Sequence, residues 1–197
     1  MFSRQMDALL DSRYVCIGGA GTKAISYIGF FQALKDARPE RYERFMEQLI
    51  GGVGTSSGAI TALCVLVQIT PERMYSACSF LLEQDVAPGM EIRRFIDHYG
   101  IDDGGTLRKA IDEVLTLIGL SAHTTFADFF RLTKKRFMCC ATLLASNTPL
   151  FFSHARTPNT KLADALFMSM CLPLIFAPMR FEGQLMVDGG LSCNVPW

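Results

Sequence analysis

The chain has little charge, no charge excess of either sign and no long hydrophobic run. Of its 197 residues, 19% are charged and the formal net charge is zero, while half are apolar. With this composition nothing indicates nucleic-acid binding or a disordered tail, and a neutral, apolar surface suits lipid or protein partners better. No run approaches the roughly 18 apolar residues of a transmembrane segment. Met1–Leu10 carries Arg4 and Asp7 without a continuous apolar core, so we expect neither a secretory signal nor an anchor there.

Metal-binding and disulfide patterns are missing as well. There is no C-x-x-C pair, no histidine lies near a cysteine at zinc spacing, and the seven cysteines are odd in number. We therefore expect no metal and no cofactor, and buried free thiols in a reducing compartment such as the cytoplasm. The cysteines are scattered along the chain at Cys16, Cys64, Cys78, Cys139, Cys140, Cys171 and Cys193.

The first 70 residues predict an α/β fold. Tyr14–Ile17 is a short β-prone run, followed by glycines and by a helical stretch, Ala24–Ala37, with almost no polar face, which we expect to be buried on most sides. A charged helix over Pro39–Gln48 follows, and Leu49–Val53 leads into a second glycine turn and a helix over Ala59–Gln68. Strand, turn and helix thus occur twice, which indicates parallel strands with crossover helices.

The rest of the chain predicts a helical layer or lid and then further strands. No internal repeat, low-complexity tract or linker interrupts it, so we expect one domain over residues 1–197. Helices are predicted from Thr70 and Pro71 onward, over Glu91–His98, Leu107–Ile118, Thr125–Leu132 (with Thr125 and Asp128 at capping-box spacing) and Leu162–Met170, and strands over Phe137–Leu144, Leu150–Ser153 and Gln184–Val187.

Gly54–Gly58 reads G-x-S-x-G between an apolar run and a helix-forming one, the layout of a nucleophile elbow. A turn of this kind is too tight for side chains on either side of the serine, which explains why Gly54 and Gly58 flank it. Ser56 is therefore a candidate nucleophile, and an ordinary Gly/Ser turn is the alternative. Ser57 is the rival nucleophile, but its position in the motif predicts that it points away.

No histidine is placed to complete a familiar triad with Ser56. All three histidines, His98, His123 and His154, follow Ser56 and precede Asp188. In α/β-hydrolases the histidine comes last in the chain, after the serine and the acid. In the chymotrypsin and subtilisin orders the histidine comes before the serine. The remaining candidate is Asp188, at a predicted strand end and followed by Gly189 and Gly190, which let another backbone come close. The alternative is a simple β-turn.

Gly18–Lys23 reads GGAGTK before the first long helix, and its backbone N–H groups can hold a negative charge. In an acyl-transfer enzyme that charge is an oxyanion, and in a dinucleotide enzyme it is pyrophosphate. Gly19, Gly21 and Ala24 do satisfy G-x-G-x-x-G/A, but Leu49–Gly52 supplies no carboxylate at the second strand end. A Walker A loop fails because Thr22 precedes Lys23. A nucleotide-binding protein with a Rossmann-like fold stays open as an alternative.

These three motifs, in this order, resemble the patatin-like phospholipase family. The family pattern is a glycine-rich oxyanion loop ending in a basic residue, then G-x-S-x-G, then Asp-Gly-Gly. Residues 163–173 (ADALFMSMCLP), with Phe176, Pro178, Asn194 and Pro196, are also similar to the family. The resemblance spans about residues 14 to 197 and implies a three-layer α/β/α fold with a central, mostly parallel sheet.

The resemblance further implies a lipid acyl hydrolase of the phospholipase A or lysophospholipase type, which needs no metal. Ser56 would attack the ester carbonyl, and Asp188 would take its proton directly. Residues 18–21 would form the oxyanion hole, through the N–H groups of Gly19, Ala20 and Gly21. Five residues would support the site: Lys23, Gly54, Gly58, Gly189 and Gly190. The implied substrate is a carboxyl-ester lipid at a membrane surface, to which a cytoplasmic protein would bind peripherally.

Some features depart from the family pattern or stay open. Ala20 and Ala24 replace glycines of the loop, which is tolerable if the φ angle of Ala20 is negative. The sequence stops at Trp197, where family domains generally continue, so we expect a compact member or a piece of a longer protein. A partner-activated or non-enzymatic module of the same fold is a further alternative. Residues Phe126, Phe129, Phe130, Phe151 and Phe152 could line an acyl channel or form core, and Lys134, Lys135 and Arg136 could touch anionic headgroups or be solvated.

Overall fold

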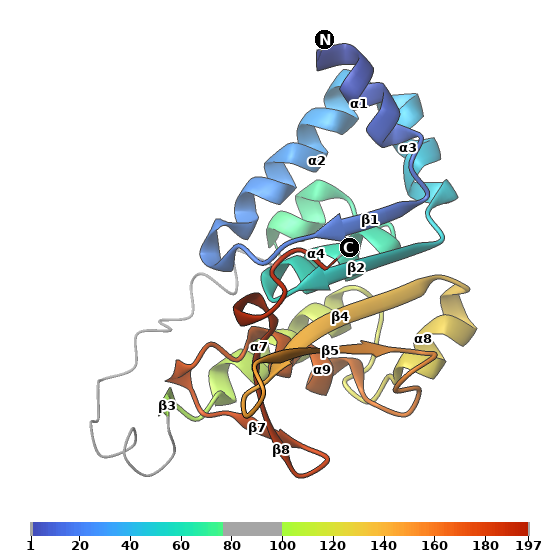
Figure 1. The fold of residues 1–197 in the computed structure, drawn as a ribbon. Coiled ribbons are helices and arrows are strands. Elements are labelled where there is room, and N and C mark those ends of the chain that lie inside the picture. The colour runs from blue at the N-terminus through green and yellow to red at the C-terminus, as the bar shows by residue number, and fades with distance from the viewer. Residues whose placement is uncertain (1, 77–99, 197) are drawn as a thin grey trace.

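The computed structural model describes residues 2–76 and 100–196 and contains a six-stranded mixed sheet. Its strand order is β1-β2-β4-β8-β7, with β5 also paired to β4 (Figure 1). The first three strands in this order are parallel and β5, β7 and β8 run antiparallel to their neighbours. The strands are β1 (Tyr14–Ile17), β2 (Gly51–Thr55), β4 (Arg136–Leu143), β5 (Thr148–Ser153), β7 (Met179–Phe181) and β8 (Gln184–Asp188). The predicted α/β class is confirmed.

The pairing of β4 determines where the site lies. One side of β4 pairs with β5 over most of its length, so the other side is shared by β2 and β8. The parallel strand β2 ends with Thr55 opposite Cys140, and the antiparallel strand β8 ends with Asp188 opposite Ala141. Two strand ends therefore arrive from opposite directions at neighbouring positions of β4.

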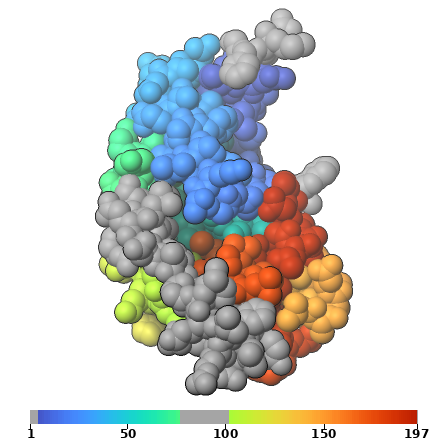
Figure 2. Space-filling model, turned by 90° about the vertical axis from the view of Figure 1, so that its left-hand side faces the viewer, coloured from blue at the N-terminus to red at the C-terminus, as the bar shows by residue number. Residues whose placement is uncertain are grey.

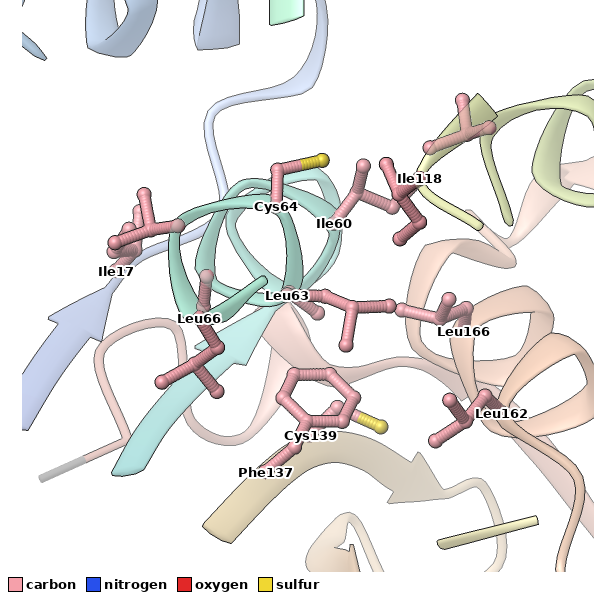
Figure 3. Packing of buried hydrophobic residues seen from close by; sticks show 14 of the residues in the cluster. Ile17, Ile60, Leu63, Cys64, Leu66, Ile118, Phe137, Cys139, Leu162 and Leu166 are labelled. Atoms are coloured by element: carbon pink, nitrogen blue, oxygen red, sulfur yellow. The ribbon is translucent and has the colours of Figure 1, made fainter. Parts of the chain in front are cut away.

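Helices cover both sides of the sheet (Figure 1). The helix α4 packs on β1, β2 and β4, and it contacts α9, which packs on β4 and β8. Figure 3 shows Leu63 and Leu66 of α4 facing Phe137 of β4, with Leu162 and Leu166 of α9 beside them. The main helices are α1 (Phe2–Leu10), α2 (Ile25–Ala37), α3 (Pro39–Gln48), α4 (Ser57–Leu66), α7 (Gly105–Leu117), α8 (Phe126–Thr133) and α9 (Leu162–Met170), with short 3-10 turns η1 (Gly21–Ala24) and η2 (Gly189–Leu191).

The phenylalanines considered for an acyl channel are mostly core. Phe126 and Phe129 are both 1% exposed and pack on the ring of Phe137, and Phe152 is 0% exposed. Phe130 is half-buried and stacks on His154. Among the described helices, none is long and apolar enough to cross a membrane.

One burial prediction is wrong and several short elements were not expected. The helix α2 buries only Ile28, Phe31 and Leu34, while Ile25 is 39% and Phe30 is 47% exposed. It lies at one edge of the described structure and not between layers (Figure 1). The unexpected elements are α1, β7 and a separate two-stranded sheet of β3 (Gly100–Asp102) and β6 (Leu174–Phe176). The helix predicted over residues 91–98 lies outside the described residues.

Candidate active site

Ser56 occupies the turn between β2 and α4, as the elbow motif predicts. Its φ of 54° and ψ of −132° belong to a region that a serine rarely adopts. A Cβ on Gly54 would collide with the backbone of Gly58 and Ala59, and one on Gly58 with that of Ile17 and Gly18. The turn therefore requires a glycine on both sides of the serine. Ser56 is 7% exposed.

Asp188 ends β8 and is 2% exposed. Its Oδ1 accepts a hydrogen bond from the N–H of Gly190 at 2.6 Å, and its backbone carbonyl accepts one from Thr142 Oγ1 at 2.8 Å. Its second carboxyl oxygen, Oδ2, is buried and has no hydrogen-bond partner among the described residues. Burial raises the pKa of this carboxyl above its ordinary value, although the nearby Ser56 hydroxyl and the N–H of Gly190 act in the opposite direction.

Ser56 and Asp188 come together because β4 aligns the ends of their strands. The Ser56 hydroxyl is close enough to lower the pKa of the Asp188 carboxyl, while Oδ2 of that carboxyl has no hydrogen-bond partner among the described residues. Hydrogen bonds between a nucleophile and its base are often loose before substrate binds. The buried Oδ2 is therefore an acceptor available to a serine hydroxyl.

The glycine-rich loop lies beside this pair. A Cβ on Gly19 would come within 3.1 Å of the Cβ of Ser56, so the loop backbone passes next to the serine. Ala20 has a φ of −136°, which satisfies the condition for alanine at that position. In the space-filling view, teal atoms of the β2–α4 region lie in a hollow between blue N-terminal and orange-to-red C-terminal segments (Figure 2).

Two of the three proposed oxyanion donors already make hydrogen bonds within the protein. The N–H of Gly19 donates to the carbonyl of Asn194 at 3.2 Å, and the N–H of Ala20 donates to Ser57 Oγ at 3.1 Å. Ser57 thus points toward the loop, and the expectation that it points away is wrong. Lys23 is exposed and contributes through its backbone, whose N–H donates to the Ala20 carbonyl at 3.0 Å.

The other candidate residues lie away from the serine. His123 is exposed and His154 stacks on Phe130, while His98 lies outside the described residues. The basic run 134–136 precedes or begins β4, whose first residue pairs with Gly51 at the start of β2, so it lies at the opposite end of the sheet from Ser56. Within residues 2–76 and 100–196, no group of three or more His, Cys, Asp or Glu side chains could hold a metal ion.

Only some of the free cysteines are buried, although all were expected to be. Cys64, Cys139, Cys140 and Cys171 are buried, Cys193 is half-buried and Cys16 is exposed, while Cys78 lies outside the described residues. Burial raises the pKa of Cys140 to about 12 and that of Cys171 to about 11. Both thiols therefore stay protonated at neutral pH, and they are poor rivals to Ser56 as nucleophiles.

Sequence reasoning missed two residues that contact the site backbone. Asn194 accepts from the N–H of Gly19 and donates through Nδ2 to the carbonyl of Gly19 at 3.3 Å, which ties the glycine loop to the segment after Asp188. Ser169 accepts from the N–H of Ser56 at 2.8 Å. Both belong to stretches that resemble the family, but a single sequence does not show which backbone groups such side chains will meet.

The fold and the site together define an α/β protein with a hydrolase-type elbow, an aspartate at an adjoining strand end and a glycine-rich loop beside them. The family model described as patatin-like phospholipase matches residues 15–197, and the chain belongs to this family.

Two curated relatives are viral proteins. The chain is 24% identical over 149 residues to "Probable lipid hydrolase 463L" of Invertebrate iridescent virus 6, covering 73% of this chain and 50% of the relative. It is 31% identical over 88 residues to an uncharacterized protein of Acanthamoeba polyphaga mimivirus, covering 45% of this chain and 29% of that protein. The chain thus spans half of the first relative and less of the second.

Solved structures confirm the fold. VipD from Legionella pneumophila superposes with a TM-score of 0.62 at 18% identity, covering 93% of this chain and 46% of VipD. Full-length ExoU from Pseudomonas aeruginosa, solved in complex with SpcU, superposes with a TM-score of 0.54 at 17% identity, covering 80% of this chain and 38% of that one. The matched region is less than half of VipD and less than half of ExoU.

Proposed function

We propose that this protein is a lipid acyl hydrolase that cleaves carboxyl esters through Ser56 and Asp188. The observation that carries the proposal is the arrival of two strand ends at neighbouring positions of β4, which brings the elbow serine beside a buried carboxyl with a free acceptor oxygen. Asp188 removes the hydroxyl proton as Ser56 Oγ attacks the ester carbonyl. No histidine is needed between them.

The reaction proceeds through an acyl-serine. Attack forms a tetrahedral oxyanion beside the glycine loop, and its collapse releases the alcohol, which takes the proton from Asp188. A water molecule then loses a proton to Asp188 and attacks the acyl carbonyl, and Ser56 leaves with that proton as the fatty acid departs. Loss of one oxyanion donor typically costs a factor of about 10²–10³ in rate. Gly19 and Ala20 must exchange their internal acceptors for the oxyanion in this scheme.

Exposed apolar side chains on the segments next to the proposed site residues support a lipid substrate, and family membership supports the phospholipase A or lysophospholipase type. Ile25 follows the glycine loop and is 39% exposed, while Leu191 and Val195 follow Asp188 and are 47% and 51% exposed. Exposed apolar side chains on the segments that follow the glycine loop and Asp188 suit contact with a lipid surface, because the contact removes water from apolar groups of the protein and of the lipid. We propose that the protein acts from the cytoplasm, peripherally on membranes.

The test compares hydrolysis of a phospholipid ester and fluorophosphonate labelling in wild type, Ser56→Ala and Asp188→Asn. We expect wild type to hydrolyse and to be labelled, Ser56→Ala to lose both, and peptide mapping to place the label on Ser56 and not on Ser57. The control is Ser146→Ala, which removes an exposed hydroxyl after β4 and should behave as wild type. Equal activity of Ser56→Ala and wild type would sink the mechanism.

The same assay, with thermal unfolding measured in the presence and absence of nucleotide, separates the rival functions. A nucleotide-binding protein would show nucleotide-dependent thermal stabilisation and no label at Ser56. A partner-activated module would hydrolyse esters only after an activating protein is added. This alternative is worth testing because ExoU, which has a similar fold, has been solved in complex with SpcU.

A further inference from the structure

Ser169 is a buried hydroxyl that contacts the backbone of the proposed nucleophile. It lies near the end of α9 and is 0% exposed. Its Oγ accepts a hydrogen bond from the N–H of Ser56 at 2.8 Å and donates one to the carbonyl of Cys140 at 2.5 Å. A hydroxyl has a single proton to donate, so both directions are fixed by the nature of the two partners. Ser169 therefore joins the elbow to β4.

The carbonyl of Cys140 also borders the acid. Gly189, the residue after Asp188, lies so close to this carbonyl that a Cβ on Gly189 would collide with it. Cys140 is the residue of β4 that pairs with Thr55, and the next residue, Ala141, pairs with Asp188. One carbonyl is thus in contact with the hydroxyl that holds Ser56 and with the glycine beside Asp188.

The same end of α9 holds the acid through its backbone. The N–H of Asp188 donates to the carbonyl of Cys171 at 2.7 Å, two residues after Ser169. The backbone N–H groups of Ser56 and Asp188 are therefore both bound by acceptors from one short segment of chain. A shift of this segment would move both residues.

We propose that Ser169 is a positioning residue that holds Ser56 in its unusual backbone conformation and at reacting distance from Asp188. The inference rests on the proposed function. A serine keeps a positive φ only where its surroundings hold it there. Without the Ser169 hydroxyl, the buried N–H of Ser56 has no acceptor, and a turn that relaxes to satisfy it carries Oγ away from the carboxyl.

The test is Ser169→Ala, which removes both hydrogen bonds, with Ser169→Thr, which keeps a hydroxyl. We expect kcat of Ser169→Ala to fall by about 10²-fold, the loss that a misplacement of about 1 Å can cause, with little change in KM. The rate of fluorophosphonate labelling at Ser56 should fall in parallel, and Ser169→Thr should restore part of both. The control is Ser153→Ala, a buried hydroxyl at the end of β5 that accepts from the N–H of Arg156 at 3.2 Å. It should lower thermal stability without changing kcat of the folded protein.

Three outcomes overturn the inference. Wild-type kcat and labelling rate in Ser169→Ala, with wild type itself active, would show that the hydroxyl does not position Ser56. If Ser169→Ala fails to fold, Ser169→Cys replaces it, because a thiol of similar size is a weak hydrogen-bonding group, and full activity of that variant would contradict the proposal. A wild-type protein that neither hydrolyses esters nor is labelled at Ser56 fails the proposed function first, and the inference with it.

Discussion

At the scale of single residues, the role proposed for Asp188 as the base sets two requirements that oppose each other. A base must be ionised to accept a proton, whereas burial penalises the ionised carboxyl and raises its pKa above the ordinary value of 3.8. A raised pKa nevertheless suits a general base, because a carboxylate of ordinary pKa binds a proton too weakly at neutral pH. The N–H of Gly190 and the Ser56 hydroxyl limit the rise.

This gives a prediction for the pH dependence of hydrolysis. Activity should increase with pH as Asp188 loses its proton, and the midpoint of that limb in kcat/KM should lie above the pKa of an exposed aspartate, about 3.9. The measurement is a pH–rate profile on a substrate whose own groups do not titrate in that range. A limb at the pKa of an exposed aspartate would contradict the burial argument.

Asp188→Asn should lose activity without losing stability. A carboxyl whose pKa is raised in the folded state binds its proton more tightly there than in the unfolded chain. Its stabilising contribution is full below the unfolded pKa of about 3.9 and is lost as pH rises through the folded pKa. At pH 7 the ionised carboxyl therefore costs stability, and an amide of the same shape removes that cost.

We expect hydrolysis by Asp188→Asn to fall by about 10²–10⁴-fold, while its urea midpoint at pH 7 lies at or above that of wild type. Any gain should shrink at pH 4. The comparison uses urea unfolding at both pH values, and a lower midpoint at pH 7 would contradict the sign of the pKa shift.

Gly19→Ala should impair catalysis by crowding. The added Cβ would lie 2.8 Å from Asn194 Oδ1 and 3.1 Å from the Cβ of Ser56, so the loop or the serine must shift. We expect a loss of roughly 10-fold or more in kcat, since a displacement of about 1 Å can cost 10²-fold. The matched control is Gly29→Ala on α2, where a Cβ meets nothing within 4 Å and wild-type hydrolysis is expected. Equal kcat in the two variants would argue against the loop as the oxyanion site.

The two proposed catalytic residues could be proposed from the sequence because each lies in a motif whose glycines are required for steric reasons. Ser56 lies in an elbow that only glycines can flank, and Asp188 is followed by Gly189, which lets the β4 backbone approach. The surrounding contacts were not predictable in this way. Ser169 and Asn194 act through hydrogen bonds to backbone groups more than 100 positions away, and Ser57 points toward the loop because Ala20 offers it an N–H.

At the scale of elements, α8 illustrates a local signal that the structure confirms. The Thr125 side chain accepts from the N–H of Asp128 at 3.1 Å, and the Asp128 carboxylate accepts from the N–H of Thr125 at 3.2 Å, which is a complete capping box. Hydrogen bonds to Thr125 lower the pKa of the Asp128 carboxyl.

Thr125→Ala should therefore cost about 1 kcal/mol in free energy of unfolding, the usual loss for such a cap. Activity should be unchanged, because α8 lies at the end of the sheet where β4 begins, away from Ser56. Urea unfolding and the ester assay measure the two effects. Thr125→Ser keeps the hydroxyl and should recover most of the stability, and no loss in Thr125→Ala would contradict the cap.

Elements with a clear sequence pattern were predicted well, and the three-residue strands were not. The predicted bounds of β1, α3 and α9 agree with the structure. The three-residue strands β3, β6 and β7 are too short to show a period. In addition, β3 and β6 pair with each other although they lie far apart in the chain. The helix α1 depends on contacts such as Arg41 Nη1 to Asp7 Oδ1 at 2.6 Å. The burial of α2 was overestimated because composition does not show that a helix lies at an edge.

At the scale of the whole molecule, α4 connects the site to the core. It begins after Ser56, and nine of its ten residues, Gly58 to Leu66, are buried. Figure 3 shows Leu63 of this helix above Phe137 of β4 and beside Leu166 of α9. The conformation of the elbow is therefore held by the same packing that holds the sheet and its helices together.

Leu63→Ala should destabilise the entire domain. Leu63 is 0% exposed, and removing such a leucine typically costs about 2–5 kcal/mol, a large part of the 5–15 kcal/mol that stabilises a domain. The control is Leu132→Ala, since Leu132 is 68% exposed and should change the free energy of unfolding by about 0.5 kcal/mol or less. Thermal and urea unfolding provide the comparison, and equal stability of the two variants would contradict the assigned core.

The pairing of β4 with β2 and β8 has a consequence for how such a site can vary. The serine directly follows the last residue of β2, the aspartate is the last residue of β8, and both strands pair with β4. The separation of the two residues is therefore set by the register of these pairings and does not depend on the length of the connections between strands. A slip of β8 by one residue would carry the carboxyl about 3.3 Å along β4 and turn it to the opposite face of the sheet. Segments inserted between the strands leave that register unchanged, so proteins that keep this pairing can differ widely in loops and in overall length while the serine and the aspartate stay together.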